Sequence, residues 1–459
     1  MAFIVQGGSI LPSSYANATE KVQQTLTGQL ESFTSRYIAD LGFWKIALTI
    51  LLALVAYDQF PAYLKPCIVP IAEDIMSPKA WVFKQGKEHV EYRKGLSGLF
   101  TNKAIATYLP VQESIYDQFF SQFVADSKAN DGKPTAFMVR FREINCALSL
   151  RTFFGNYISQ DAVQRIANDF YLVTAALELV NPWRGKRVAD SCQVDFARCA
   201  AACKENMARG AEPTCVVDQW VLHMLACERY RERVAAGETD AEKPPNLIPV
   251  FSDVEIGRTL FTFLFASQDA SSSATTWLFQ VLAQRPEMVA RVRAENLAAR
   301  GGDRRRPFDL DMYPALPYTR AVVKELLRYR PPVIFVPYVA TKKFPITPDY
   351  TVGKGAMVIP SCYPALHDPA VYRDPETFDP ERWISGDAES KTKNWLVFGA
   401  GPHDCLARSY VPLQMAHMIG KAALDIDFVH HPTPRSEEIR VFATLFPMDG
   451  CQLVFTKRE

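Results

Sequence analysis

A glycine-rich loop near the C-terminal end constrains the fold of this chain more than any other stretch. Residues 398–405 read FGAGPHDC, and an amphipathic run follows at 410–424. Two glycines and a proline favour a tight, non-helical loop that a flat group can approach closely. We expect Cys405 at the opening of the following helix, where free N–H groups and the positive end of the helix dipole favour a thiolate.

Two interpretations of Cys405 follow from this loop. A thiolate that is shielded by Phe398 and lies near the basic His403 suits the iron of a haem, whose propionates are acidic. A free cysteine that packs in a turn as a small hydrophobe is the alternative, and the loop by itself favours that alternative. Other segments therefore have to decide between the two.

The composition excludes several other classes of protein. Of the 459 residues 48% are hydrophobic, which is ample for one large helical domain, and 51 Lys and Arg nearly balance 50 Asp and Glu. Because there is no strong overall basic charge, we expect no nucleic-acid partner. The 10 cysteines have no CxxC spacing, so we expect reduced thiols in a cytosol-facing domain. Five cysteines at 192–227 are expected to pack between helices, because their irregular spacing does not suit zinc.

The N-terminal part predicts a membrane anchor. Residues 1–40 are a polar, uneven tail, and residues 41–57 are apolar apart from Lys45 and a few small residues. This run is slightly shorter than the ~20 residues that span a bilayer. A tilted helix or a thin membrane such as the endoplasmic reticulum accommodates it, with the lysine reaching the interface. A buried core helix is the alternative.

A long helix is predicted in the middle of the chain. Ser252 and Glu255 form a capping-box pattern, and Arg285-Pro286 ends the helix after roughly thirty residues, or about 50 Å. Its centre, 266–273, reads ASQDASSS. Small side chains let a flat ligand approach, while Asp269 and the serines can relay protons. Close packing of two helices through small residues is the alternative.

Two pairs of charged residues complete the candidate site. His89 and Arg93 are four residues apart in a helical run at 87–109, so they share one helix face. Glu325 and Arg328 are three apart on a later helix and can form an ion pair. In isolation, the first pair is equally typical of a solvated helix surface, and for the second pair an exposed surface position is the favoured interpretation.

Short strands are predicted after the second of these pairs. Residues 331–337, 350–352 and 356–359 are rich in β-branched side chains and are bounded by prolines. The apolar first group, together with 442–447, suits a large lipophilic substrate, and packing in the core is the competing explanation.

Taken together, these segments resemble the cytochrome P-450 superfamily, the haem-thiolate monooxygenases. The spacing of Phe398, Gly401, His403 and Cys405 is similar to their haem-binding signature. The runs 265–273 and 394–399 are similar to the fungal sterol C-22 desaturases of that superfamily. Two positions depart from the pattern, because Ala407 stands where the family usually has glycine and Ala270 where it has threonine.

The resemblance implies a mainly helical fold with small β-sheets. In this fold, haem lies between the long central helix and the cysteine loop with its helix, and Cys405 is the thiolate ligand of the iron. His89 and Arg93 bind the propionates from the helix over the haem. The residues that it implies around the haem are Cys405, His403, Phe398, Gly399, Arg93, His89 and Ala266.

The resemblance also assigns catalytic and structural roles. Asp269 matches the acid of the family, and Ser271 is the nearest hydroxyl, so these two are expected to deliver protons. Glu325 and Arg328 are expected to be buried and to be completed by Arg382 of a Pro-Glu-Arg segment. This cluster would serve folding and haem loading rather than chemistry.

The activity implied by the resemblance is the removal of hydrogens from C-22 and C-23 of a sterol side chain, as in ergosterol biosynthesis. Electrons would come from NADPH through a separate flavoprotein reductase, because the chain has no nucleotide-binding glycine pattern. The domain at 61–459 would face the cytosol from the endoplasmic reticulum membrane. A local basic patch is expected to dock the reductase: Arg93, Lys94, Lys391, Lys393 and Arg408.

Alternatives to this activity remain, because the part between Phe60 and His89 is shorter than in full members of the family. Without the missing strands, the strands after Arg328 would lose partners and expose an edge. A catalytically impaired haem- or sterol-binding relic and a structural membrane protein without haem are two alternatives. A monooxygenase that hydroxylates another lipophilic substrate is the third.

Overall fold

The chain divides into two compact units, which are described separately. One unit comprises Met1–Pro70 and Val336–Pro360, and the other comprises Ile71–Phe335 and Ser361–Glu459. The computed structural model describes residues 2–3, 70–84, 86–177, 181–335, 338–340, 343–401, 403–441 and 444–459. The predicted anchor at 41–57 and nearly all of the tail at 1–40 lie outside these residues. Within the described ranges, we find no helix with the length and apolar character needed to cross a membrane.

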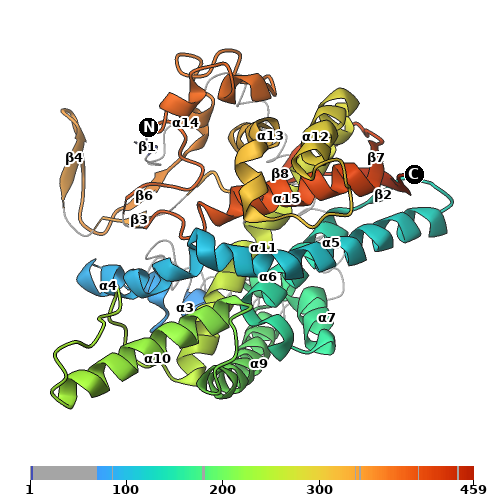
Figure 1. Ribbon diagram of the computed structural model, residues 1–459. Coiled ribbons are helices and arrows are strands. Elements are labelled where there is room, and N and C mark those ends of the chain that lie inside the picture. Colours follow the sequence, from blue (N-terminus) through green and yellow to red (C-terminus); the bar gives the residue numbers. More distant parts are fainter. Residues whose placement is uncertain are drawn as a thin grey trace, which may run out of the picture. The chain divides into compact units, whose positions relative to one another are not determined.

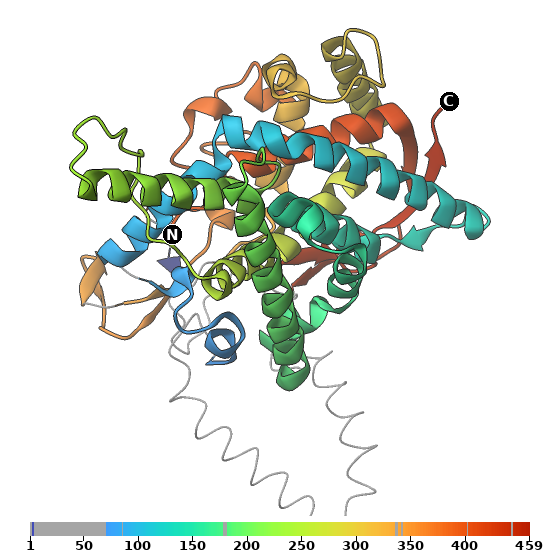
Figure 2. The same ribbon diagram turned by 60° about the horizontal axis from the view of Figure 1, so that its bottom comes forward.

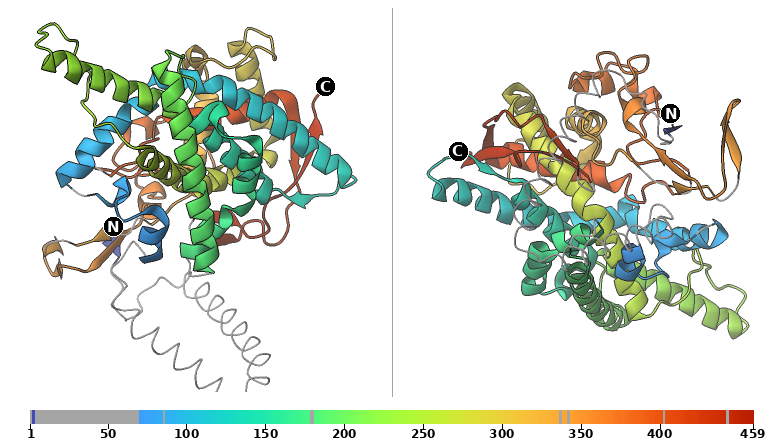
Figure 3. Two further views of the ribbon diagram at one scale, coloured as in Figure 1. Left: turned by 90° about the horizontal axis from the view of Figure 1, so that it is seen from below. Right: turned by 180° about the vertical axis from the view of Figure 1, so that it is seen from behind.

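The larger unit is organised around helix α11, Asp253–Ala283. Helices α9 (Pro182–Ala208) and α6 (Met138–Phe154) pack along it. On its other side lies α15 (Tyr410–Asp425), which packs on α5 (Asn102–Ala129), as Figures 1 and 3 show. The helix that follows the cysteine loop is therefore built into the same core as the central helix.

Local sequence explains both ends of α11. The hydroxyl of Ser252 accepts a hydrogen bond from the N–H of Glu255 while the Glu255 carboxylate accepts from the N–H of Ser252, so the predicted capping box is present. The helix ends at the C-cap residue Gln284, before Arg285 and Pro286. Close packing on α9 requires Gly257, because a Cβ there would lie 2.9 Å from the backbone N of Ala197.

The predicted single helical run at 87–109 is wrong, because the structure contains two helices there. Helix α4 spans Gly86–Ser97, a 3-10 turn follows at Gly98–Phe100, and α5 begins at Asn102. Thr101 is extended and accepts a hydrogen bond from the N–H of Ala104 through its hydroxyl, 3.3 Å away. An N-cap hydroxyl starts a new helix at this point and outweighs the continuous helical pattern.

The remaining helices cover the core from several sides. Helices α9 and α10 cross at one side of the unit in Figure 2. The five cysteines at 192–227 are all free and buried in the packing of these two helices and the loop between them. The other helices are α3 (Pro70–Met76), α7 (Gln160–Asp169), α8 (Tyr171–Leu177), α10 (Val216–Ala235), α12 (Pro286–Ala299), α13 (Pro317–Tyr329) and α14 (Tyr363–Leu366).

The sheets of the larger unit are small and antiparallel. Strand β10 (Gln452–Lys457) lies between β2 (Thr135–Ala136) and β7 (Ile426–His430), with Val454 opposite Val429. Strands β8 (Ile439–Val441) and β9 (Leu445–Pro447) form a hairpin, and β9 packs on α11.

The smaller unit contains the other strands. β6 (Met357–Pro360) is paired on both sides, by β1 (Ala2–Phe3) and β3 (Tyr338–Val339). β4 (Phe344–Thr347) pairs with β5 (Tyr350–Val352). The strands predicted at 350–352 and 356–359 are therefore present. Of the group predicted at 331–337, only Phe335 forms a bridge, to Ser361, and residues 336–337 lie outside the described part. The prediction of a mainly helical fold with small sheets is confirmed.

Candidate active site

The cysteine loop folds back on itself. The N–H of Cys405 donates to the carbonyl oxygen of Phe398 at 2.8 Å, which closes the loop at its two ends. Gly399 and Gly401 have φ values of 70° and 79°, a region that glycine enters without steric cost. A Cβ at Gly401 would meet no atom within 4 Å, so the backbone angle rather than packing requires glycine there. The half-buried thiol of Cys405 is thus held on a short and rigid loop.

Cys405 does not lie at the opening of the helix, which corrects the expectation from the sequence. Turns occupy the residues after it, and α15 begins only at Tyr410, whose N–H donates to the carbonyl of Ala407 at 3.0 Å. Burial raises the pKa of the Cys405 thiol, while the N–H of Ala407 and the charges of Arg93 and Arg408 act in the opposite direction. Burial and the neighbouring charge of Asp404 outweigh these groups, so the pKa of Cys405 is raised overall and the expected stabilisation of a thiolate by the helix dipole is not found.

Helix α4 is fastened to the cysteine loop by two contacts. Nη2 of Arg93 lies 2.6 Å from Oδ1 of Asp404, next to Cys405 in sequence. The ring of His89 stacks on the ring of His403 with centroids 3.9 Å apart. Burial lowers the pKa of His89, and the charges of His403 and Arg93 lower it further, so His89 is kept neutral at neutral pH. The structure thus brings the two predicted propionate-binding residues to the rim of the loop.

One face of α11 is open at its middle, around Ala266. Thr259, Phe263, Ala266 and Ala270 share a face by helical periodicity. The hydroxyl of Thr259 is 2.7 Å from that of Tyr92 on α4, so this face is directed to the side where α4 and the cysteine loop lie. Most of α11 is buried, yet Ala266 in its middle is exposed. Small side chains and exposure at this point leave room for a flat group.

Asp269 lies on the flank of that open face and is already partnered. Its Oδ1 forms an ion pair with Arg142 of α6, and its Oδ2 accepts a hydrogen bond from the hydroxyl of Thr174 on α8 at 2.5 Å. The carboxylate is buried, with 6% of the residue exposed. Within the described ranges the hydroxyl of the half-buried Ser271 makes no hydrogen bond. The two predicted proton-relay residues therefore differ, since one is held in place and the other is free.

Glu325 is the centre of a buried network. Arg328 donates to it from Nε at 2.9 Å and from Nη2 at 2.8 Å, and Arg382 donates from Nε at 3.0 Å. The indole N–H of Trp383 and the backbone N–H of Asp379 each donate to it at 2.9 Å. The side chains of Glu325 and Arg328 are 0% exposed, so this is not a solvated surface pair. The network joins α13 to the segment that precedes the cysteine loop.

Comparison with known proteins identifies the family. The model of the cytochrome P450 family matches residues 52–421. This chain belongs to the cytochrome P450 family. Its fold is also that of the solved P450 structures: retinoic acid-bound cyanobacterial CYP120A1 superposes with a TM-score of 0.69 at 19% identity, covering 88% of each chain.

Several fungal P450 relatives align over most of this P450. It is 71% identical to C-22 sterol desaturase ERG5B of Gibberella zeae, over 88% of this chain and 78% of the relative. It is also 71% identical to cytochrome P450 monooxygenase oblE of Emericella variicolor, over 86% of this chain and 77% of the relative. C-22 sterol desaturase ERG5 of Saccharomyces cerevisiae is 48% identical, over 87% of this chain and 75% of the relative.

The residues of this P450 fit the haem that the family implies. Cys405 offers a half-buried sulfur ligand, and the exposed Ala266 leaves space on the central helix. Arg93 and the neutral ring of His89 lie at the rim, where acidic propionates need donors. We therefore take Cys405 as the residue that would ligate the iron.

The basic patch predicted for reductase docking is partly neutralised. Arg93 and Arg408 share the carboxylate of Asp404, and Nζ of Lys391 lies 3.0 Å from Oδ2 of Asp387. Two lysines of the predicted patch remain exposed, with no ion pair in the described part of the P450: Lys94 and Lys393.

Several partners of the site were missed by sequence reasoning. These partners lie more than 90 positions from the site residues that they contact: Arg142 and Thr174 contact Asp269, and Asp404 contacts Arg93. Asp404 also lies beside Cys405, but no recognisable pattern marks it. The one signal for Arg142 was that a buried Asp269 needs a cation, which does not say which of the basic residues supplies it. Trp383 directly follows Arg382, but its contact with Glu325 depends on packing alone.

Proposed function

We propose that this cytochrome P450 is a sterol C-22 desaturase, which introduces the double bond between C-22 and C-23 of a sterol side chain in ergosterol biosynthesis. The observation that carries the proposal is the 71% identity to a C-22 sterol desaturase over 88% of the chain. Relatives with the same name at 48% and 46% identity each align with 87% of the chain. The agreement is therefore not confined to one relative.

Cys405 is the residue that we assign to the iron. When bound, the haem supplies an iron centre that activates oxygen for removal of hydrogen from an unactivated carbon, and a thiolate ligand favours O–O cleavage. Burial raises the pKa of this thiol, and the N–H of Ala407 and the charges of Arg93 and Arg408 oppose that rise, so these groups would stabilise the thiolate once iron is bound. Arg93 and His89 are assigned to the propionates because both lie at the loop from α4.

Asp269 is assigned to proton delivery, with Ser271 as the neighbouring hydroxyl. A general acid has to hold a proton at a defined place and pass it on. Release of the Arg142 or Thr174 contact would free one oxygen of the Asp269 carboxylate to take up a proton. The hydroxyl of Ser271 has no competing hydrogen bond among the described residues, so it is free to accept that proton and hand it onward.

The proposal also names an electron donor and a membrane. NADPH would supply electrons through an NADPH-cytochrome reductase, and the exposed Lys94 and Lys393 are our candidates for contact with it. We assign the protein to the endoplasmic reticulum membrane, with 41–57 as its anchor and the catalytic domain in the cytosol. Support comes from the apolar composition of 41–57 and from the lipophilic nature of a sterol.

Hydroxylation of another lipophilic substrate is the second candidate function. The observation that favours it is that a relative of equal identity, 71%, is named a cytochrome P450 monooxygenase. Both reactions begin with removal of a hydrogen from a carbon, so the site described above serves either one. Only the product distinguishes them.

Product analysis with a defined sterol tests the proposal. The full chain is combined with a reductase, NADPH and a sterol that has a saturated side chain, and the product is analysed by mass spectrometry. A desaturase yields a sterol that has lost two hydrogens, in a reaction that requires NADPH. A sterol that has gained an oxygen would instead support the monooxygenase. Unchanged sterol despite an intact haem-thiolate spectrum would support the impaired relic and overturn the proposal.

A further inference from the structure

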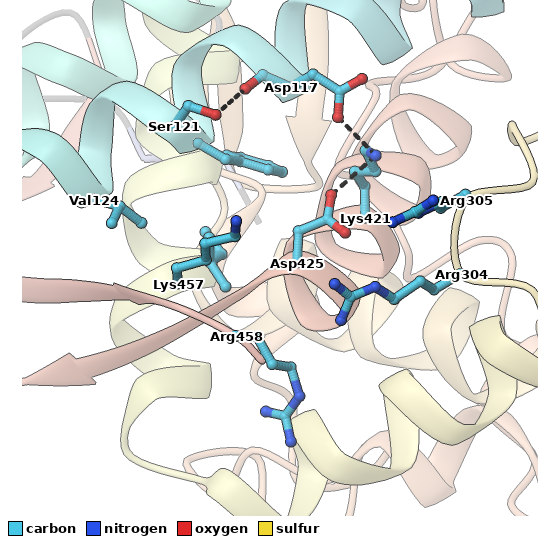
Figure 4. A pocket seen from close by; sticks show the side chains of 11 residues that line it. Asp117, Ser121, Val124, Arg304, Arg305, Lys421, Asp425, Lys457 and Arg458 are labelled. Atoms are coloured by element: carbon cyan, nitrogen blue, oxygen red, sulfur yellow. Dashed lines mark hydrogen bonds and ion pairs between the residues drawn. The ribbon is translucent and has the colours of Figure 1, made fainter.

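A cavity of about 380 Å³ lies at the end of α15 that is remote from Cys405. It opens between α5, the last turn of α15, the loop after α12 and the C-terminal strand β10, and it shares no residue with the site described above (Figure 4). Its size falls within the range of about 300–1,000 Å³ that is typical of small-molecule pockets. The residues that line it are Asp117, Phe120, Ser121, Val124, Arg304, Arg305, Lys421, Asp425, Ile426, Lys457 and Arg458.

The acidic residues of this cavity are already used. Nζ of Lys421 lies 2.7 Å from Oδ1 of Asp117 and 2.9 Å from Oδ2 of Asp425, as the dashed lines in Figure 4 show. It also lies 3.3 Å from Oε1 of the nearby Glu113. Both carboxylates of the wall are therefore directed at Lys421 and not at the other cations.

Three other cations of the cavity have no side-chain carboxylate partner among the described residues. In the described part of the chain, no side-chain carboxylate lies within 4.0 Å of the charged groups of Arg304, Arg305 or Lys457. Arg304 donates a hydrogen bond from Nη1 to the main-chain oxygen of Glu459 at 3.2 Å. In Figure 4 the charged ends of Lys457 and Arg304 are directed into the hollow. Like charges gathered in a concave wall raise the local positive potential and favour an anionic occupant.

Arg458 provides a contrast within the same wall. Its guanidinium forms an ion pair with Asp427 and points away from the hollow in Figure 4. It is therefore a cation of this cavity that already has a counterion and is not available to a ligand.

The floor of the cavity is apolar. Phe120 and Ile426 are each 2% exposed and lie under the cations, next to the half-buried Val124. The hydroxyl of Ser121 is already donated to the backbone oxygen of Asp117 at 2.8 Å. Because Phe120 and Ile426 are almost fully covered, the apolar side chain that an occupant can reach is that of Val124.

We propose that this cavity binds a phosphorylated small molecule, with its phosphates on Arg304, Arg305 and Lys457 and an apolar ring against Val124. Guanidinium groups match the oxygens of phosphate with paired hydrogen bonds, and a flexible lysine adds a point charge. The proposal is independent of the sterol reaction, because the two sites have no residue in common.

Calorimetric titration of the full chain tests this proposal. The soluble probes are inorganic pyrophosphate and ADP, measured at low ionic strength because salt screens such contacts. Both probes are expected to bind, ADP more tightly because its base adds apolar contact. Replacing both Arg305→Gln and Lys457→Gln should weaken binding by about tenfold for each cation removed. The matched control Arg458→Gln should leave the affinity within about twofold of the original, because its charge already has a partner.

A vesicle arm identifies the source of the phosphate. The protein could bind vesicles that contain phosphoinositide, in a manner that requires Arg305 and Lys457, while neither soluble probe binds. This result would assign the same phosphate chemistry to a lipid headgroup. Absence of binding to all probes would overturn the proposal, as would equal affinities for the double variant and the original protein. The reduced carbon-monoxide spectrum should be unchanged in every variant, which shows that the fold and the haem site are intact.

Discussion

Arg93 donates to Asp404 with Nη2 only 2.6 Å from Oδ1, although the two residues are 311 positions apart. The other oxygen of Asp404 accepts from Arg408 at 2.7 Å. A single carboxylate beside Cys405 thus joins α4 to the loop and holds two cations near the thiol. This contact explains how a helix early in the chain is aligned with the cysteine loop near its end.

Cys405→Ala should abolish the haem-thiolate spectrum. Without the sulfur, no other residue of the loop offers a thiolate to iron, and we expect complete loss of the reduced carbon-monoxide band and of product. The control is Cys362→Ala, because Cys362 is also half-buried but bonds only to the backbone oxygen of Val333, 3.3 Å away. A thiolate-type band retained in Cys405→Ala would refute the ligand assignment.

Asp269→Asn should slow turnover while the haem spectrum stays intact. An amide keeps the shape of the carboxylate and its hydrogen bond with Thr174, but it has no proton to exchange at neutral pH and no charge for Arg142. We expect turnover to fall by about tenfold or more, since positioned acid–base groups contribute factors of about 10²–10⁴. NADPH consumption and product are measured together. Unchanged product formation would show that Asp269 does not carry the proton.

Glu325→Gln should destabilise the fold strongly. Two guanidinium groups, those of Arg328 and Arg382, would lose their only carboxylate in the interior. Stranding a buried charge costs about 3–5 kcal/mol, which urea denaturation measures directly. In contrast, Glu381→Gln breaks the exposed ion pair with Arg291 and should change stability by less than about 1 kcal/mol. Equal effects of the two substitutions would contradict the structural role of Glu325.

The ionisation of Glu113 should make the free energy of unfolding depend on pH in the acid range. Burial by itself would raise its pKa, but the hydrogen bond and charge of His417 and the charges of Lys421 and Arg300 lower it to about 2 from 4.5. A carboxyl with a depressed pKa stabilises the fold above its unfolded value and loses that contribution as pH falls through its folded value. The contribution should therefore decline between pH 4.5 and about 2.

A pair of variants measures this contribution. Above pH 4.5, Glu113→Gln should be less stable than the original protein, on the order of 2–3 kcal/mol in urea denaturation, and the two should converge toward pH 2. Glu88→Gln is the control, because the side chain of Glu88 is 68% exposed in its pair with Lys84. A difference that stays constant over the whole acid range would contradict the depressed pKa.

Gly420→Ala should disturb the packing of α12 on α15. A Cβ at Gly420 would lie 2.1 Å from Oδ1 of Asn296, whose amide donates to the backbone oxygen of Val292 and to the hydroxyl of Thr319, each at 2.9 Å. Overpacking of this kind costs about 1–3 kcal/mol. The loss should shrink in an Asn296→Ser background, which has a shorter side chain.

A second glycine gives the comparison for that prediction. A Cβ at Gly98 would meet no atom within 4 Å, so Gly98→Ala should leave the melting temperature nearly unchanged. A melting temperature for Gly420→Ala that equals that of Gly98→Ala would show that the two helices separate without cost.

Features that depend on neighbouring residues were predictable from the sequence. Three of these features are local patterns, and the structure contains each of them: the capping box of Ser252 and Glu255, the helix that ends before Pro286, and the glycine loop before Cys405. The break between α4 and α5 was missed, because the helical periodicity of the apolar residues continues across the cap at Thr101. Here the apolar periodicity and the N-cap residue predict different structures, and tertiary packing determines which of the two forms.

The sequence by itself determined the chemical groups of this P450: the thiol of Cys405, the acid of Asp269 and the buried charge of Glu325. Only the tertiary structure decided the partners that were not expected, which are Arg142 for Asp269 and Trp383 for Glu325. It also decided that α15 begins after the ligand rather than at it. The physical reason is that a buried charge requires a partner, whereas the choice among 51 basic residues depends on which helix faces meet when the core closes.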